Sequence, residues 1–571
     1  MPETTSTKSM DEIPSQDFKD DSESSETDQK DGSLLSYDLL KRLQHSAKHA
    51  RQRGIVLPTL EQQQNPSLIP DEIRSSLKSI NPEALDPLNL FRINWYNDGK
   101  GGFSDIPAHI VLPPSLTGLK CKVAVMLGAF FPTGAHKVGA TYSVLSDKLV
   151  TGAFDPSKHT AVFPSTGNYA RGGAFNSSLL GCKSVSILPK RMSRERFEDL
   201  AKLGSSIIKT PGIESSIKEV FDTADRLVRE DPENVVVLNQ FTALENSMWH
   251  YNCTGPALES VFEAVRGERD ELSGVFMCAG SAGTLGGGTY LVDKYPGVKC
   301  GVGEAIQCPT MMSNGFGEHR IEGIGDKHVP WIFKARTPSL IAGIDDNHVM
   351  RVFRLFNEPA GRAYLRKTCP DIDEAFIESL SLLGISSVAN ILGALSMSRY
   401  YEYGPGDVVV TVATDTSRLY HSRLETLRMT QRTTEHIATA DKADDELYSE
   451  IHASYDAKLL RGEAPLVVKE LLFSDKKRIH NQKYTGWVEP GKKTISELKQ
   501  QWSDKSYWQK SYAKFDVLNE RIQMFNRLIF EDACKEGDID MVQRSASVCG
   551  ILNPECLLHS HSEGLSSEEE E

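Results

Sequence analysis

The stretch Pro132-Thr133-Gly134-Ala135-His136-Lys137 decides how this chain is interpreted, because it sets a lysine where a strand is expected to give way to a helix. The apolar run Val123-Ala124-Val125-Met126-Leu127 precedes it and has the composition of a buried strand. Pro132 and Gly134 predict a turn, and a helix is expected to begin near Lys137. The positive end of the helix dipole disfavours a charged ammonium there, and burial would lower its pKa. Taken alone, a lysine in such a position is more often a surface residue.

Similar strand candidates recur along the chain. They are short, apolar and β-branched, and a Gly-rich turn and a helix-like stretch follow each of them: residues 160–163, 184–188, 206–208, 274–277, 298–302 and 408–412. Buried parallel strands that alternate with helices predict an α/β architecture.

The composition divides the 571 residues into five segments. We expect disordered polar tails over residues 1–33 and 556–571, which have almost nothing to bury. Residues 34–84 predict a short amphipathic helix that ends at Gln52, followed by a Pro-rich linker. The α/β pattern occupies residues 85–430. Residues 431–555 lose the alternation and predict a largely helical extension, either packed on the catalytic region or serving a partner contact.

Charge and cysteine content narrow the class of protein. A net charge of −14 argues against nucleic-acid or anionic-membrane partners. None of the ten cysteines forms a C-x-x-C pair, which indicates reduced thiols and neither a disulfide framework nor a metal site. No stretch approaches the roughly 18 apolar residues of a membrane span, and the N-terminus has no signal-peptide pattern. We therefore expect a soluble cytoplasmic protein.

Polar, glycine-containing stretches follow two of the strand candidates. The first stretch, Pro164-Ser165-Thr166-Gly167-Asn168, follows residues 160–163, and its hydroxyls and amide donors suit an anion. Taken alone, this stretch is typical of an ordinary helix N-terminus, with Ser165 and Thr166 as capping residues. Gly280-Ser281-Ala282-Gly283-Thr284 follows residues 274–277 and lets backbone N–H groups converge on a phosphate at a helix N-terminus. It is no Walker motif, and no acidic residue is placed for a ribose, which favours a phosphate without a nucleotide. Close helix–strand packing is the alternative.

In this order, the motifs resemble those of the fold-type II pyridoxal-phosphate enzymes, which include cysteine synthase, cystathionine β-synthase, threonine dehydratase and the tryptophan synthase β subunit. The resemblance covers about residues 85–430. It implies a fold of two α/β subdomains with twisted, mostly parallel sheets, and pyridoxal 5'-phosphate in the cleft between them. It also implies a homodimer.

The resemblance assigns roles to these residues. Lys137 matches the lysine that forms the Schiff base with the cofactor. Asn168 matches the residue that contacts the cofactor's phenolic oxygen. The loop that binds the phosphate corresponds to Gly280, Ser281, Ala282, Gly283 and Thr284. Ser165, Thr166, Gly167 and Asn168 match the substrate-carboxylate loop. The segment Ile321-Glu322-Gly323-Ile324-Gly325 resembles one that lies near the substrate mouth.

A further site follows the last strand candidate. Thr414-Asp415-Thr416-Ser417 resembles a stretch of the cystathionine β-synthase branch in which a hydroxyl contacts the pyridine nitrogen, and Thr416 falls on that position, with Thr414 and Asp415 as alternatives. A hydroxyl cannot keep that nitrogen protonated as a carboxylate would, which favours β-elimination over transamination. The sequence departs from the family at Phe131, where Asn is usual, and at Ala135, where Ser is common. Taken together, these matches and departures favour the cysteine synthase branch of the family.

The resemblance therefore implies β-elimination or β-replacement on a small amino acid such as cysteine, serine or O-acetylserine, by way of a Lys137 aldimine and an aminoacrylate. The leaving group and any second nucleophile stay open. Alternatives within the enzyme class are a serine/threonine dehydratase and a tryptophan-synthase-β-like enzyme. A non-catalytic scaffold of the same fold is the alternative from another class.

Overall fold

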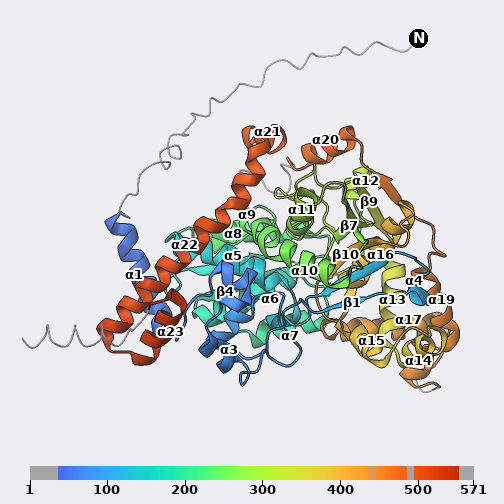
Figure 1. Cartoon of the computed structure of the whole chain (residues 1–571), viewed down its shortest axis with the longest axis horizontal. Coiled ribbons are helices and arrows are strands. Elements are labelled where there is room, and N and C mark those ends of the chain that lie inside the picture. The colour runs from blue at the N-terminus through green and yellow to red at the C-terminus, as the bar shows by residue number, and fades with distance from the viewer. Residues whose placement is uncertain (1–35, 166, 439–440, 485–493, 552–571) are drawn as a thin grey trace, which may run out of the picture.

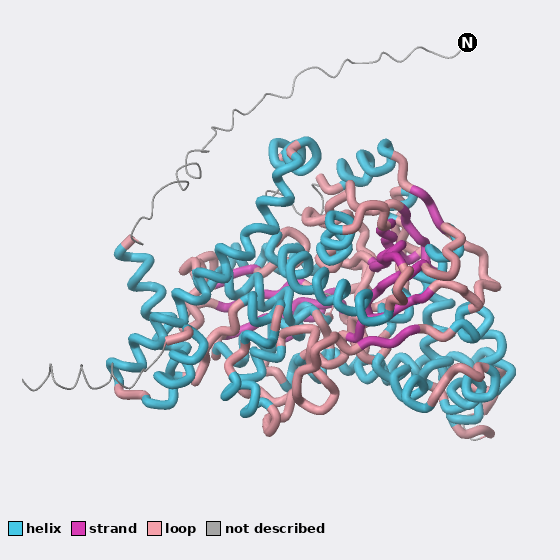
Figure 2. The backbone as a smooth tube through the Cα atoms, viewed as in Figure 1, coloured by secondary structure: helices cyan, strands magenta, loops and turns pink. Residues whose placement is uncertain are grey.

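The computed structural model describes residues 36–165, 167–438, 441–484 and 494–551, and its strands form two sheets. Figure 2 shows the strands gathered in two groups with helices around them. Both predicted tails lie outside the described residues. The two sheets and their helices confirm the predicted α/β class.

The larger sheet has seven strands in the order β1-β2-β10-β7-β8-β9-β11. The neighbours from β2 to β9 are parallel, and only the edge strands β1 and β11 run antiparallel. Strand β10 lies between β2 and β7, and the residue that follows it, Thr414, lines the site described below. The bounds are β1 His109–Val111, β2 Lys122–Leu127, β7 Glu271–Cys278, β8 Lys299–Ala305, β9 Leu340–Ile344, β10 Asp407–Ala413 and β11 Val468–Glu470.

The smaller sheet is fully parallel, with the order β5-β4-β3-β6. Its strands are β3 Thr160–Pro164, β4 Lys183–Pro189, β5 Ser206–Thr210 and β6 Val235–Val237. Helix α8 (Ile217–Glu230) covers this sheet with an apolar stripe that includes Val220 and Phe221. The seven predicted strands are all present; β1, β6 and β11, of three residues each, and β9 were not predicted. A three-residue strand carries too little alternation to be detected.

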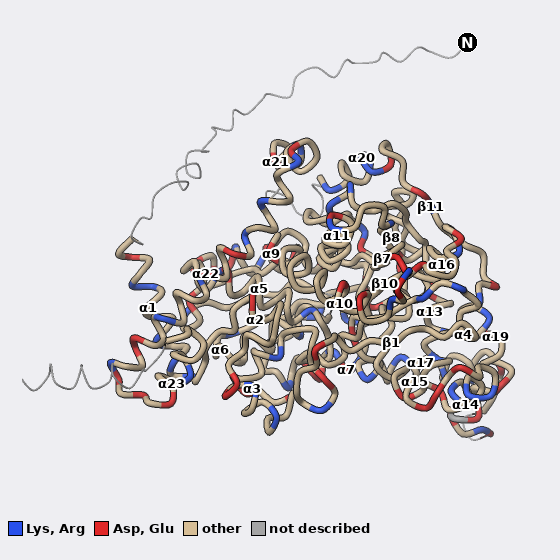
Figure 3. Tube along the Cα trace, viewed as in Figure 1, with Lys and Arg blue, Asp and Glu red and all other residues tan. Residues whose placement is uncertain are grey.

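Helices fill the space around both sheets. Those that position the site are α5 Lys137–Val150, α6 Asn168–Leu180, α7 Arg194–Lys202, α9 Leu244–Trp249, α11 Leu285–Lys294, α16 Ile385–Tyr400 and α17 His421–Thr434. Others are α1 Tyr37–Gln52, α10 Gly255–Val265, α12 Thr310–Ser313, α13 Asp346–Asn357, α14 Pro359–Thr368, α15 Glu374–Ser379, α19 Glu450–Leu460, α20 Phe473–Gln482, α21 Ile495–Ser503, α22 Lys505–Glu536 and α23 Ile539–Cys549. Figure 3 shows both signs of charge interspersed along the outer helices.

Among the described helices, none alone is long and apolar enough to cross a membrane. A consecutive pair, Glu374–Leu382 with Ile385–Tyr400, meets the length and composition test together, with a bend of 116° between its halves.

The C-terminal extension packs on the body of the protein. The long helix α22 runs diagonally across the molecule beside α1 (Figure 1), and it contributes Phe515, Ile522 and Phe525 to the main core. Asn526 on α22 forms two hydrogen bonds with the backbone of Leu57, donating to its carbonyl at 2.8 Å and accepting from its N–H at 3.0 Å. Strand β11 completes the larger sheet. Distant parts of the chain thus share one core.

Candidate functional site

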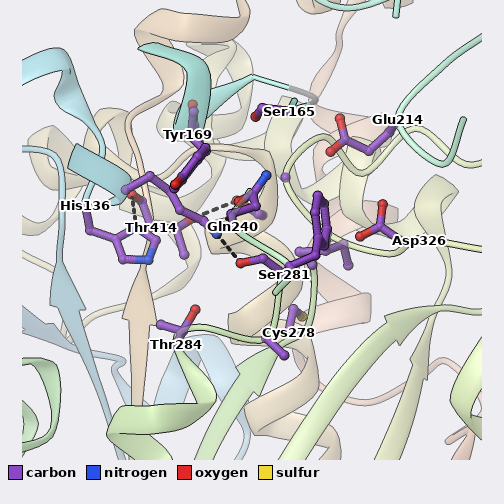
Figure 4. Close-up of a pocket in the computed structure, with 18 of the residues that line it drawn as sticks. His136, Ser165, Tyr169, Glu214, Gln240, Cys278, Ser281, Thr284, Asp326 and Thr414 are labelled. Atoms are coloured by element: carbon purple, nitrogen blue, oxygen red, sulfur yellow. Dashed lines mark hydrogen bonds between the residues drawn. The ribbon is translucent and has the colours of Figure 1, made fainter. Parts of the chain in front are cut away.

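Lys137 is the first residue of α5, and its ammonium points into a buried pocket. Nζ donates to Ser281 Oγ at 2.7 Å and to Gln240 Oε1 at 3.1 Å (Figure 4). Burial lowers the pKa of Lys137 from 10.5 to about 8, although the carboxylates of Asp326 and Glu214 oppose the shift. Helix α5 begins at Lys137, which confirms the predicted start. The lysine residue is half-buried, and its ammonium lies inside the pocket.

The turn before Lys137 is tied to the end of β10. His136 N donates to the Thr414 carbonyl at 3.1 Å, and Gly128 N donates to the Ala413 carbonyl at 2.7 Å. The ring nitrogen Nδ1 of His136 lies 2.9 Å from the same Thr414 oxygen. Burial and the charge of Lys137 lower the pKa of His136 to about 3, so this ring is neutral. These contacts hold the lysine in one position relative to the central sheet.

The Gly280–Thr284 loop lies between β7 and α11, as predicted. Gly280, Ser281, Ala282 and Thr284 line the Lys137 pocket. Within the described residues, none of the backbone N–H groups from Gly280 to Leu285 donates a hydrogen bond. Amide donors at a helix N-terminus suit a phosphate. This loop therefore has the donors and the position that a phosphate group requires.

Glycine is required in this loop for close packing. A Cβ on Gly283 would lie 2.1 Å from Asn246 Oδ1, and a Cβ on Gly280 would lie 2.9 Å from the Gly323 carbonyl oxygen. Asn246 in turn donates to Ser281 Oγ at 3.1 Å and to the Gln240 carbonyl at 2.8 Å. Gly283 itself is not part of the pocket lining. It supports Asn246, which holds both partners of Lys137.

The loop after β3 reaches the same pocket. Ser165 and Asn168 line it, and Ser165 Oγ accepts from Gly167 N at 3.0 Å. The N-cap of α6 is Gly167, with no capping side chain, so the expectation that Ser165 caps the helix is wrong. The serine hydroxyl is turned back onto its own loop instead. Thr166 lies outside the described residues.

Asn168 connects the pocket to a buried polar network. Its Nδ2 donates to Asp415 Oδ2 at 2.6 Å, while its Oδ1 is buried without a hydrogen-bond partner. The hydroxyl of Tyr420 also donates to Asp415 Oδ2, and it lies 3.2 Å from Arg196 Nη2. Burial raises the pKa of Asp415, an effect that the two hydrogen bonds oppose. Asp415 thus orients Asn168 from behind the pocket.

Thr416 lies apart from these residues. Its hydroxyl donates to the Ser381 carbonyl at 3.1 Å, and it is not part of the pocket lining. Thr414, named above as an alternative, lines the pocket with Ser386, and their hydroxyl oxygens are 2.6 Å apart. Thr414 directly follows the last residue of β10, whereas the chain has turned away two residues later. Thr414 therefore lines the pocket, whereas Thr416 does not, and a contact of either hydroxyl with the ring nitrogen stays a prediction.

The pocket also contains residues that were not predicted. They come from loops and helices far apart in the sequence: Tyr169, Glu214, Gln240, Phe241, Asp326, Ser386 and Asn390. Gln240 follows β6, a three-residue strand, so the sequence carried no signal long enough to predict this residue. Glu214 and Asp326 carry no motif.

Comparisons with known proteins agree with this arrangement. The family described as "Pyridoxal-phosphate dependent enzyme" matches residues 107–415, more than half of the chain. A probable cysteine synthase of Bacillus subtilis (strain 168) is 25% identical over 305 residues, which cover 53% of this chain and 88% of the relative. A cystathionine beta-synthase of Apis mellifera is 28% identical over 255 residues, 43% of this chain.

The chain spans about half the length of the cystathionine beta-synthases that it matches, 49% for that of Apis mellifera. Among solved structures, a hydrogen sulfide-producing enzyme of Fusobacterium nucleatum has a TM-score of 0.47 at 20% identity, covering 58% of this chain and 98% of the other. The family match begins at Pro107, just before β1, and ends at Asp415. This chain belongs to the pyridoxal-phosphate dependent enzyme family, near the cysteine synthase branch.

Proposed function

We propose that this enzyme catalyses β-elimination or β-replacement on a small amino acid such as cysteine, serine or O-acetylserine, with Lys137 as both cofactor anchor and base. The observation that carries the proposal is the Lys137 ammonium inside the pocket, held by Ser281 and Gln240 with a pKa lowered to about 8. With a pKa of about 8, roughly a tenth of the amine is neutral at pH 7, far more than for an ordinary lysine. Only a neutral amine attacks an aldehyde or takes a proton.

The residues present fit pyridoxal phosphate. The Gly280–Thr284 loop would hold the phosphate through backbone N–H groups, Asn168 would contact the ring, and Thr414 with Ser386 would offer hydroxyls to the ring nitrogen. When bound, the cofactor supplies an electron-withdrawing ring that stabilises negative charge at the α-carbon of the substrate.

The chain's own residues supply binding and proton transfer. The substrate carboxylate docks at Ser165 and Asn168, where the N-terminus of α6 favours an anion. Nζ of Lys137 takes the proton from the α-carbon and returns it, while Ser281 and Gln240 keep the amine in position. The neutral His136 adds no charge behind the lysine. The β-substituent then leaves the substrate with its electron pair.

Borohydride reduction of the holoenzyme, followed by peptide mapping, tests the anchor. We expect the reduced cofactor on Lys137, and no such adduct in Lys137→Ala. Lys148→Ala, a change in the last turn of the same helix, serves as the control and should keep the adduct. Cofactor found on another lysine, or a protein with no cofactor absorbance band, would overturn the assignment and favour a non-catalytic scaffold.

The reaction class is tested on the same preparation. Sulfide and pyruvate from cysteine indicate elimination, and cysteine from O-acetylserine with sulfide indicates replacement. Keto acid from serine or threonine, without sulfide chemistry, would indicate a dehydratase and contradict the proposal.

A further inference from the structure

A buried arginine, Arg196 on α7, lies behind the loop at which the substrate carboxylate is proposed to dock. Its side chain is fully buried, and each of its three guanidinium nitrogens lies close to a different side chain. Nη1 donates to Glu214 Oε2 at 3.4 Å, Nε lies 3.0 Å from Glu322 Oε2, and Nη2 donates to the Tyr420 hydroxyl at 3.2 Å. Because the guanidinium is planar and rigid, three partners in three directions fix its position.

The guanidinium lies directly against the carboxylate loop, by which we mean Ser165, Gly167 and Asn168. A Cβ on Gly167 would lie 2.0 Å from Nη1 and 2.3 Å from Cζ of Arg196, whereas real Cβ contacts are essentially never shorter than 3.0 Å. Gly167 is also the N-cap of α6. Arg196 therefore supports the carboxylate loop at the residue where this helix begins, and only glycine leaves room for the contact.

The Tyr420 hydroxyl extends this support to Asn168. It donates to Asp415 Oδ2, which also accepts from Asn168 Nδ2 at 2.6 Å. A hydroxyl has one hydrogen, so it accepts from Arg196 and donates to Asp415. The result is one chain of hydrogen bonds from the guanidinium to Asn168, and no residue in it is more than 8% exposed.

The charge of Arg196 is used within the protein. Glu214, which lines the pocket (Figure 4), and Glu322 both lie within 3.4 Å of the guanidinium. Glu322 also pairs with Arg423. Arg196 itself is not part of the pocket lining. Its influence on a bound ligand therefore passes through the carboxylate loop and requires no direct contact.

We propose that Arg196 is a positioning residue for the α-carboxylate of the substrate. It holds Gly167 by direct contact, and it holds Asn168 through Tyr420 and Asp415. This inference rests on the proposed function, which places the carboxylate at that loop. Binding depends on donors in fixed positions, and a misplacement of about 1 Å can cost up to about 100-fold.

Alanine and alaninamide form a matched pair of probes, because they differ only in the carboxylate that the loop is proposed to bind. Neither has a leaving group on its β-carbon. Dissociation constants are measured on the holoenzyme from the change in cofactor absorbance. The ratio of the two constants, which we call the carboxylate preference, reports on the carboxylate loop separately from the rest of the pocket.

Arg196→Lys should lower the carboxylate preference about tenfold, since lysine keeps the charge but lacks the planar group that reaches three partners. The affinity for alaninamide should stay close to that of the wild-type enzyme. Tyr420→Phe should lower the preference by about threefold, because it breaks only the chain to Asn168. Arg194→Lys, the same change on an exposed arginine of α7, is the control and should keep the preference.

Gly167→Ala is a second test that leaves Arg196 in place, because the added methyl group displaces either the guanidinium or the loop. It should lower the carboxylate preference as Arg196→Lys does. Gly288→Ala, whose Cβ would lie 3.2 Å from its nearest neighbour, is the matched control and should not. Thermal unfolding checks that each variant is folded. If Arg196→Lys does not fold, Gly167→Ala and Tyr420→Phe decide the question.

Equal losses of affinity for alanine and alaninamide in Arg196→Lys would indicate a general structural role and overturn the inference. A preference that persists in both Arg196→Lys and Gly167→Ala, or equal affinities for the two probes in the wild-type enzyme, would also overturn it. The proposed function fails separately, because it requires product from a β-substituted amino acid. An enzyme whose preference depends on Arg196 but that releases no such product would contradict the proposed function alone.

Discussion

Replacing Gly283 by alanine should disturb the site indirectly, through Asn246, because neither residue lines the pocket. The new Cβ would lie 2.1 Å from Asn246 Oδ1 and 2.9 Å from Asn246 Nδ2. Ordinary van der Waals contact begins near 3.4 Å, so the loop or Asn246 has to move by about 1.3 Å. Asn246 is fully buried and has little room to move. Its hydrogen bonds to Ser281 and to the Gln240 backbone are the contacts at risk.

The expected cost combines two effects. Overpacking a core costs about 1–3 kcal/mol, and a buried donor left without its acceptor costs about 1–3 kcal/mol more. The free energy of unfolding should therefore fall by about 2–6 kcal/mol. Cofactor affinity should fall at least about tenfold, the equivalent of 1.4 kcal/mol, because both hydrogen-bond partners of Lys137 lose their positioning.

Thermal unfolding of the apo-enzyme and a cofactor titration measure the two effects. Gly288→Ala is the matched control, since its Cβ would lie 3.2 Å from Cys300 Sγ and 3.7 Å from Met277 Sδ in the interior of α11. Alanine favours a helix interior over glycine by about 1 kcal/mol, so this variant should be near neutral. A Gly283→Ala protein with unchanged Tm and cofactor affinity would refute the reasoning.

Three more perturbations test other parts of the structure. Cofactor capture by the apo-enzyme should accelerate about tenfold between pH 7 and pH 9, because the neutral fraction of Lys137 grows as pH passes its pKa of about 8; a flat profile would contradict a buried amine. Because this folded-state pKa lies below the unfolded value of 10.5, the apo-enzyme should also gain stability as pH rises from 8 toward 10.5. Thr414→Val should weaken cofactor binding or shift its absorbance, whereas Thr416→Val should leave both unchanged; the reverse result would restore Thr416 as the ring contact. Asn526→Ala should lower the free energy of unfolding by about 1–3 kcal/mol, measured by denaturant titration, because it leaves two backbone groups of Leu57 unpaired.

The sequence predicted the elements whose signals are local. Val123–Leu127 is apolar over its whole length, and a turn with proline and glycine follows it, so strand β2 and the start of α5 at Lys137 were both predictable. The Gly280–Thr284 loop was predictable for the same reason, since it lies between a recognisable strand and helix. In each case neighbours in the chain determine the conformation.

The packing of helix α22 could not be predicted from local sequence patterns. The sequence predicted a largely helical region here. Only the tertiary structure shows that Phe515, Ile522 and Phe525 belong to the main core. The partner of Asn526 is Leu57, which lies 469 positions away in the sequence. No periodicity in a segment encodes the identity of so distant a neighbour.

The sequence by itself determined the α/β class, the family and the helix that begins at Lys137, because strand–turn–helix units are specified by adjacent residues. Only the tertiary structure decided which residues surround the lysine. It placed Thr414 at the pocket and Thr416 away from it, and it brought Gln240, Glu214 and Asp326 into the pocket. The physical reason is that parallel strands bring their carboxyl ends to one edge of a sheet, so loops distant in the sequence converge there.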